Sequence, residues 1–133
     1  MSTRAFITGI SGPRLSAAER EFIRSERPWG FILFKRNIET PEQVVLLVGE
    51  LRDAIENPDA PVLIDQEGGR VQRLGPPHWP AYPPGAVFGV LYDIDRALGL
   101  TAARLSARLM AATASAEVNP ENSPEFTVIP CSP

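Results

Sequence analysis

Four charged side chains lie close together at residues 65–73, where Asp65 and Glu67 are followed by Arg70 and Arg73. Carboxylates accept hydrogen bonds from sugar hydroxyls, and guanidinium groups donate to hydroxyl or carbonyl oxygens. The glycine pair between the carboxylates and the arginines allows a sharp turn of the backbone. The pattern favours a site for neutral, hydroxyl-rich ligands. The alternative is an ion pair that only ties the loop in place.

A phosphate-binding loop is the rival interpretation of the glycine pair. Neither G-x-x-x-x-G-K-[ST] nor G-x-G-x-x-G occurs in the sequence, and the carboxylates of Asp65 and Glu67 would repel an anion. The chain contains one histidine, His78, and one cysteine, Cys131. These counts exclude multi-histidine and cysteine-rich metal sites, and we expect neither a metal nor a cofactor.

Strands and helices are predicted to alternate in the order β-α-β-α-β-loop-α, with a possible further strand at residues 126–129. Apolar runs at residues 4–10, 30–35 and 61–64 predict strands of a parallel sheet. The run 30–35 is almost entirely apolar, which is typical of a strand covered on both faces. This order predicts the α/β class, built from repeated βα units.

Three helices are predicted between and after these strands. The first starts at a capping box formed by Ser16 and Glu19, and the second starts at Thr40, which precedes a proline. The third covers residues 93–112. One side of it carries a stripe made of Ile94, Leu98, Thr101, Leu105 and Leu109.

The chemistry of such a sheet is expected on the loops that follow the carboxyl ends of its strands. These loops are residues 9–15, 36–40 and 65–89, and the third is the longest and the most polar. Asp65 is the first residue after the third strand, so its carboxylate is expected to point into this face.

Several other side chains fall on these loops. His78 is interpreted as a surface or packing residue, whereas sugar stacking and packing against neighbouring prolines explain Trp79 and Tyr82 equally well. Arg36 and Asn37 follow the second strand, where they would either contact the site or brace the loop.

The overall composition is that of an ordinary globular protein, with 44% hydrophobic residues, 22% charged residues and a net charge of −3. This charge gives no reason to expect nucleic acid or an anionic membrane as a partner. The apolar runs are far shorter than the roughly 18 residues of a membrane-spanning helix. We therefore expect no nucleic acid and no membrane among its partners.

Residues 64–74, with the sequence I-D-Q-E-G-G-R-V-Q-R-L, resemble the D-Q-E-G-G-R-V-Q-R-L signature of bacterial β-N-acetylhexosaminidases (NagZ type) of glycoside hydrolase family 3. Residues 29–37, W-G-F-I-L-F-K-R-N, are similar to the G-x-I-L-F-x-R-N strand and loop of the same family. The similarity covers residues 4–112. It implies the amino-terminal portion of a (β/α)₈ TIM barrel, with about three βα units and a divergent tail.

The resemblance implies retaining hydrolysis of terminal β-linked N-acetylglucosamine, in peptidoglycan recycling in the bacterial cytoplasm. The ligand would be an N-acetylglucosamine-containing saccharide or a muropeptide. Asp65 would hold the sugar hydroxyls and Arg73 would contact the substrate, whereas Glu67 and Arg70 would shape the loop.

The catalytic residues of the family have no counterpart in this sequence. Its nucleophile is an aspartate further along the chain, and its acid/base is a histidine after a K-H-x-P-G-H-G segment. No lysine–histidine pair occurs here, and no aspartate follows Asp95. We expect an enzyme family member whose chain, as given, is inactive and holds part of the binding half of the site. The alternative is a non-catalytic truncated remnant or a weak sugar-binding module.

We divide the chain into a partial barrel domain, residues 1–112, and a divergent tail, residues 113–133. The tail holds three glutamates, no basic residue and four prolines, and proline does not continue a helix. It is either a degraded continuation or an out-of-frame or foreign sequence, and our hypothesis is a truncated gene product.

The length has a structural consequence, because a (β/α)₈ barrel typically needs about 250 residues and this chain has 133. Unpaired strand edges and uncovered core side chains are therefore expected. Although the family is expected to be monomeric, we expect self-association, aggregation or a partly molten state here.

Overall fold

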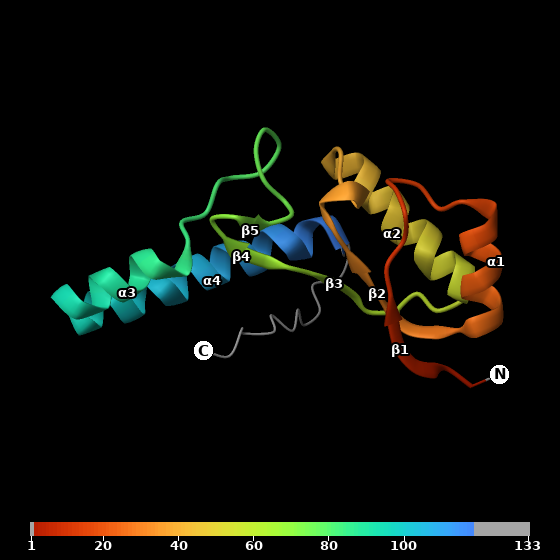
Figure 1. Ribbon diagram of the computed structural model, residues 1–133, viewed down its shortest axis with the longest axis horizontal. Coiled ribbons are helices and arrows are strands. Elements are labelled where there is room, and N and C mark those ends of the chain that lie inside the picture. Colours follow the sequence, from red (N-terminus) through yellow and green to blue (C-terminus); the bar gives the residue numbers. More distant parts are fainter. Residues whose placement is uncertain (1, 119–133) are drawn as a thin grey trace. The chain divides into compact units, whose positions relative to one another are not determined.

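The computed structural model describes residues 2–118, and the strand considered at residues 126–129 lies outside them, as does Cys131. The chain forms two compact units, Met1–Asp65 and Gln66–Pro133. Figure 1 shows the elements along the chain.

The first unit contains a parallel sheet with the strand order β1-β2-β3. Its strands are β1 (Arg4–Thr8), β2 (Pro28–Leu33) and β3 (Val62–Ile64), connected by α1 (Ala17–Glu26) and α2 (Pro41–Ile55). The three predicted strands and both connecting helices are confirmed (Figure 1). Since the strands pair in parallel, their carboxyl ends meet at one edge of the sheet.

Both helices begin at the predicted caps. The Ser16 hydroxyl accepts a hydrogen bond from the Glu19 N–H at 3.3 Å, and the Glu19 carboxylate accepts one from the Ser16 N–H at 3.0 Å. At α2, the Thr40 hydroxyl accepts a hydrogen bond from the Gln43 N–H at 3.2 Å. These contacts satisfy backbone groups that a helix end leaves without partners.

The core of the first unit is formed by α2 and the sheet. α2 buries one face, made of Val44, Leu47, Val48, Leu51, Ala54 and Ile55. In β2, Phe31 and Leu33 are buried, whereas Ile32 between them stays partly exposed. Pro28 and Gly30, which point to the opposite face, are buried as well, whereas Trp29 is exposed, so β2 is covered on both faces over part of its length.

The second unit begins with a hairpin where the sequence predicts a loop. Its antiparallel strands are β4 (Gln66–Gly68) and β5 (Val71–Gln72). Gly68 has φ +84°, and a Cβ there would lie 2.3 Å from the Pro83 carbonyl oxygen. A side chain at this position would meet both an unfavourable backbone conformation and a steric clash, so the glycine is required.

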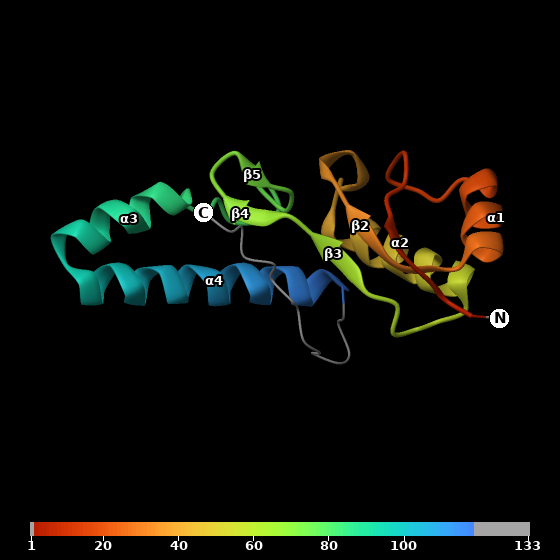
Figure 2. The same cartoon turned by 60° about the horizontal axis from the view of Figure 1, so that its bottom comes forward.

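The predicted helix 93–112 is wrong at both ends, because two helices are present. They are α3 (Gly85–Ile94) and α4 (Arg96–Val118). Asp95 separates them, since its carboxylate accepts hydrogen bonds from the N–H groups of Ala97 at 2.9 Å and Leu98 at 3.1 Å and so caps α4. Figure 2 shows α3 folded back along α4 as a helical hairpin.

Close packing of the hairpin depends on Gly99. A Cβ at this position would lie 2.5 Å from the Cα of Tyr92. The apolar stripe predicted for one helix is divided between two, because Ile94 ends α3 whereas Leu98, Leu105 and Leu109 lie in α4, and all four side chains are exposed. The hairpin therefore uses a different face of α4 for its own packing.

Candidate functional site

The loops at the carboxyl edge of the sheet are held together by a buried asparagine. Asn37 is fully buried at the end of the short 3₁₀ helix Lys35–Asn37, which follows β2. Its amide nitrogen donates hydrogen bonds to the carbonyl oxygens of Ile10 at 3.1 Å and Gly12 at 2.8 Å. Its Oδ1 accepts one from the Phe34 N–H at 2.8 Å. The side chain thus joins the loop after β1 to the loop after β2.

Two further side chains complete this brace. The Nε of Arg36 donates to the Ile10 carbonyl oxygen at 2.9 Å, and its guanidinium lies 4.7 Å from the centre of the Phe34 ring. The Nε2 of Gln43 donates to the carbonyl oxygens of Pro13 at 2.6 Å and Asn37 at 3.0 Å. Of the two interpretations of Arg36 and Asn37, the brace is confirmed. The sequence pattern places Gln43 at the start of α2, three residues after the Thr40 cap, but it does not predict these contacts with the loops.

Glu19 ties α1 to the same loop. Its Oε1 accepts a hydrogen bond from the Ser11 N–H at 2.7 Å, and its Oε2 accepts one from the Ser16 hydroxyl at 2.6 Å. Burial by itself would raise the pKa of Glu19, but the hydrogen bonds from Ser16 and Ser11 outweigh it and lower the pKa to about 2. Glu19 is therefore a structural carboxylate that stays ionised near neutral pH.

Asp65 directly follows β3 and closes the first unit. Its side chain is half-buried. Parallel pairing with β2 places the end of β3 at the same sheet edge as the braced loops. Its role as a sugar ligand remains a prediction.

In the second unit, Gln66 positions the backbone at Arg73. The buried Gln66 accepts hydrogen bonds at Oε1 from the N–H groups of Arg73 and Leu74, both at 3.1 Å. Its Nε2 donates to the Leu74 carbonyl oxygen at 2.8 Å. Arg73 is half-buried. The contact of the Arg73 side chain with substrate, like the role of Asp65, stays a prediction.

Gln72, which pairs with Gln66 across the hairpin, holds the Pro-rich segment. Its side chain accepts a hydrogen bond from the Tyr82 N–H at 2.9 Å and donates to the Pro80 carbonyl oxygen at 2.6 Å. The sequence pattern assigned the shaping of this loop to Glu67 and Arg70, both of which are exposed. The sequence pattern does not single out Gln66 and Gln72 as the residues that hold this loop, although their facing positions in a hairpin are a usable signal for that role.

The aromatic residues of the Pro-rich segment have packing roles. Trp79 is buried, with 7% of its surface exposed, and the His78 ring lies edge-on at 5.7 Å. A ring this buried offers no open face for a sugar. The Tyr82 hydroxyl lies 2.7 Å from the Thr113 hydroxyl and donates to the Leu109 carbonyl oxygen at 3.2 Å. Tyr82 therefore fastens this segment to α4.

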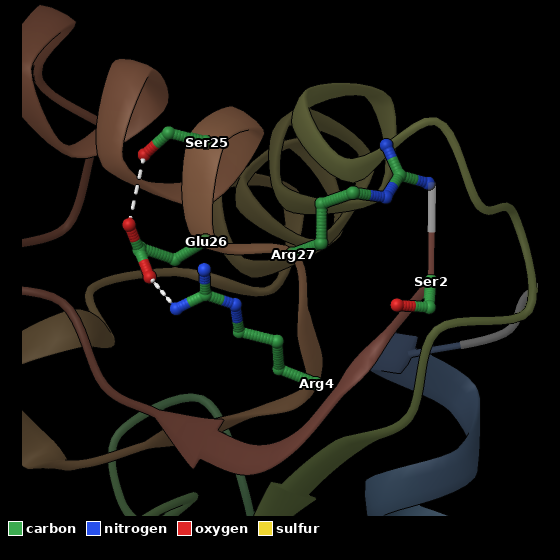
Figure 3. A pocket seen from close by; sticks show the side chains of 5 residues that line it. All are labelled: Ser2, Arg4, Ser25, Glu26 and Arg27. Atoms are coloured by element: carbon green, nitrogen blue, oxygen red, sulfur yellow. Dashed lines mark hydrogen bonds and ion pairs between the residues drawn. The ribbon is translucent and has the colours of Figure 1, made fainter.

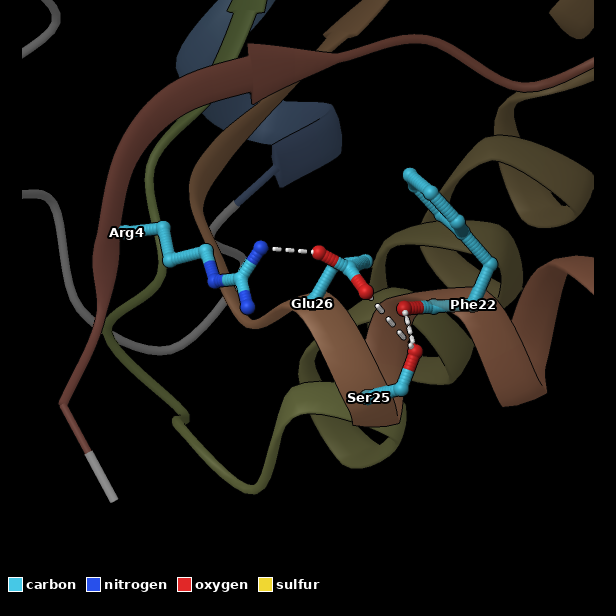
Figure 4. Close-up of polar contacts among 4 residues, drawn as sticks. All are labelled: Arg4, Phe22, Ser25 and Glu26. Atoms are coloured by element: carbon cyan, nitrogen blue, oxygen red, sulfur yellow. Dashed lines mark hydrogen bonds and ion pairs between the residues drawn. The ribbon is translucent and has the colours of Figure 1, made fainter.

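A cavity of about 210 Å³ in the first unit is lined by Ser2, Arg4, Ser25, Glu26 and Arg27 (Figure 3). Arg4 forms an ion pair with Glu26, and the Ser25 hydroxyl donates to the Phe22 carbonyl oxygen at 3.1 Å (Figure 4). This cavity adjoins the amino ends of β1 and β2. Since chemistry in such sheets lies beyond the carboxyl ends, the cavity is not the candidate site.

Metal-binding clusters and membrane-spanning helices are both absent from the described part of the chain. Its residues contain no group of three or more histidine, cysteine, aspartate or glutamate side chains that could hold a metal ion. None of the helices in residues 2–118 has the length and apolar character needed to cross a membrane.

Comparison with known proteins finds β-hexosaminidases among the relatives of this chain. A β-hexosaminidase of Xanthomonas campestris is 40% identical over 105 residues, which cover 79% of this chain and 31% of the relative. A β-hexosaminidase of Methylococcus capsulatus is 41% identical over 103 residues, which cover 77% and 29%. No protein-family model matches the chain.

Solved structures agree with these relatives. NagZ from Neisseria gonorrhoeae, crystallised with N-trifluoroacetyl-D-glucosamine, superposes with a TM-score of 0.80 at 30% identity, over 87% of this chain and 34% of NagZ. This chain is homologous to the amino-terminal region of NagZ-type β-hexosaminidases. A family 3 β-N-acetylglucosaminidase from a Paenibacillus species superposes with a TM-score of 0.63 at 27% identity, over 85% of this chain and 20% of that protein.

The match to NagZ confirms two of the predictions. The resemblance to the β-N-acetylhexosaminidases is confirmed, and the chain has the fold of the amino-terminal portion of a TIM barrel. The chain spans about a third of the length of the β-hexosaminidases that it matches. The division at residue 112 stays a prediction.

Proposed function

We propose that this chain is the sugar-binding, amino-terminal part of a bacterial β-N-acetylhexosaminidase that hydrolyses terminal β-linked N-acetylglucosamine with retention of configuration. The observation that carries the proposal is the position of the D-Q-E-G-G-R-V-Q-R-L segment, which begins directly after β3 at the carboxyl edge of the sheet. Sites of βα barrels lie at this edge. The 40% identity to a β-hexosaminidase supports the choice of ligand class.

Asp65 is the proposed acceptor for the sugar hydroxyls, because an ionised carboxylate can accept from two vicinal hydroxyls at once. Arg73 is the proposed donor to the substrate, and the hydrogen bonds from its backbone and that of Leu74 to Gln66 preorganise it. Binding residues with fixed backbones lose less entropy when a ligand arrives.

Retaining hydrolysis also requires a nucleophilic carboxylate and an acid/base group. We propose that both lie outside these 133 residues, so that this chain binds the sugar without hydrolysing it. The proposed setting is peptidoglycan recycling in the bacterial cytoplasm, with a muropeptide or another N-acetylglucosamine-containing saccharide as the ligand.

The proposal is tested by titrating the chain with N-acetylglucosamine and following amide NMR shifts. With few contacts available, a dissociation constant on the order of 1 mM is expected. Asp65→Ala should weaken binding about tenfold or more, which corresponds to about 1.4 kcal/mol. Asp53→Ala removes an exposed carboxylate of α2 and should leave the constant unchanged.

A hydrolysis assay separates the two parts of the proposal. The purified chain should not cleave a chromogenic β-N-acetylglucosaminide. Turnover that disappears in Asp65→Ala would contradict the proposed absence of catalytic groups. No saturable shift, or binding that Asp65→Ala leaves intact, would contradict the sugar-binding role and favour a remnant without function.

A further inference from the structure

The backbone at Arg73 and Leu74 is held by a side chain rather than by strand pairing. β5 ends at Gln72, so both residues lie beyond the ladder of the hairpin. The Oε1 of Gln66 accepts hydrogen bonds from the N–H groups of Arg73 and Leu74, both at 3.1 Å. Gln66 is 9% exposed and Leu74 is 1% exposed, and hydrogen bonds screened from water in this way are stronger than exposed ones.

The two facing glutamines of the hairpin meet at one carbonyl oxygen. The Nε2 of Gln66 and the Nε2 of Gln72 each donate to the Leu74 carbonyl oxygen at 2.8 Å. A carbonyl oxygen has two lone pairs and accommodates both donors. The donor role is therefore duplicated, because this oxygen keeps one amide when the other is removed.

The acceptor role is not shared between the two glutamines. The Oε1 of Gln72 accepts from the Tyr82 N–H at 2.9 Å and so serves the Pro-rich segment. A backbone N–H has one hydrogen to donate, and the Arg73 N–H is committed to Gln66. Because a guanidinium lies at the end of a long side chain, a small backbone rotation displaces it by on the order of 1 Å, enough to loosen a binding site.

We propose that Gln66 is a positioning residue of the sugar site. Its Oε1 fixes the Arg73 backbone and thereby the direction from which the guanidinium reaches the substrate. This role rests on the proposed function, in which Arg73 donates to the substrate. The positioning belongs to the acceptor oxygen of Gln66 and not to its donor nitrogen, which Gln72 duplicates.

Substitutions at the two glutamines separate the acceptor from the donor. Gln66→Met keeps the length of the side chain and removes both functions. Gln66→Glu keeps an acceptor oxygen in either protonation state. Gln72→Met is the matched control, because it removes the second donor to the Leu74 carbonyl oxygen and leaves the acceptor of the Arg73 N–H in place.

Amide hydrogen exchange in the ligand-free chain measures the positioning without any sugar. In Gln66→Met the Arg73 N–H should exchange at least about tenfold faster than in wild type, whereas in Gln66→Glu and Gln72→Met it should stay within about threefold. The Gly69 N–H, which donates to the Tyr82 carbonyl oxygen at 2.9 Å, is the internal reference and should be unchanged in Gln66→Met. Unchanged exchange at Arg73, or an equal increase at Gly69, would overturn the proposal.

Titration with N-acetylglucosamine, followed by amide NMR shifts, measures the consequence for binding. Gln66→Met should raise the dissociation constant about fivefold, whereas Gln66→Glu and Gln72→Met should stay within about twofold of wild type. In an Arg73→Ala background, Gln66→Met should change the constant by less than about twofold, because the side chain that it positions is gone. Equal losses in Gln66→Met and Gln72→Met, or a fivefold loss that persists without Arg73, would overturn the proposal.

The two measurements distinguish failure of this role from failure of the proposed function. A wild-type chain without a saturable shift contradicts the proposed function, and with it any role of Gln66 in sugar binding. Saturable binding with unchanged exchange at Arg73 in Gln66→Met overturns the positioning role alone. Urea denaturation shows whether each variant folds. Gln66→Asn, which withdraws the amide by one methylene, is a second variant that should give the same two results as Gln66→Met.

Discussion

Asn37→Ala tests whether the loops at the carboxyl edge depend on one buried amide. The substitution removes hydrogen bonds to the carbonyl oxygens of Ile10 and Gly12 and from the Phe34 N–H. Each is worth about 1 kcal/mol. The Ile10 carbonyl oxygen retains the Arg36 donor at 2.9 Å, so its loss is partly compensated. We expect the free energy of unfolding to fall by about 2–3 kcal/mol.

Urea denaturation followed by far-UV circular dichroism measures this loss. With a urea dependence of about 1–3 kcal/mol per molar, the midpoint should fall by about 1–2 M. Asn57→Ala is the control, because the Asn57 side chain accepts one exposed hydrogen bond, from the Asp59 N–H at 3.1 Å, and exposed bonds of this kind contribute little. It should cost less than about 1 kcal/mol. If the two variants unfold within about 0.5 kcal/mol of each other, the brace does not hold the loops.

Two further predictions concern the backbone and the pH dependence. Gly68→Ala should destabilise the second unit by about 2 kcal/mol or more, since φ is +84° and the new Cβ would lie 2.3 Å from the Pro83 carbonyl oxygen. The control is Gly89→Ala in α3, where a Cβ would meet nothing within 4 Å, and this variant should be neutral or slightly stabilising. Similar urea midpoints for the two variants would contradict the clash at Gly68. The pKa of Glu19 is lowered from 4.5 to about 2, so its contribution to stability is present above about pH 4.5 and is lost as the pH falls through 2. Glu19→Gln should be less stable at pH 7 and should lack this acid loss, and an unchanged acid profile of the urea midpoint would count against the assignment.

Much of the fold of the first unit was predictable because its signals are local. The caps at Ser16 and Thr40 need only neighbouring residues, and so does the apolar run that forms β2. The position of Asp65 after β3 was predictable from the apolar run that forms β3.

The boundary between α3 and α4 was not predictable in this way, because the apolar spacing continues through Asp95 and gives no sign that one helix ends there. The carboxylate of Asp95 caps α4, and the close approach of Tyr92 to Gly99 then stabilises the chain reversal.

The amino-acid sequence by itself determined the α/β class, the family resemblance and the candidates Asp65 and Arg73, since motifs and periodicities are properties of neighbouring residues. Only the tertiary structure decided that Asn37, Gln43 and Gln66 hold the loops. Asn37 and Ile10 lie 27 positions apart, and they meet because parallel strands bring successive loops to one edge of the sheet. A hydrogen bond of this kind depends on the arrangement of whole elements, so no local pattern reveals it.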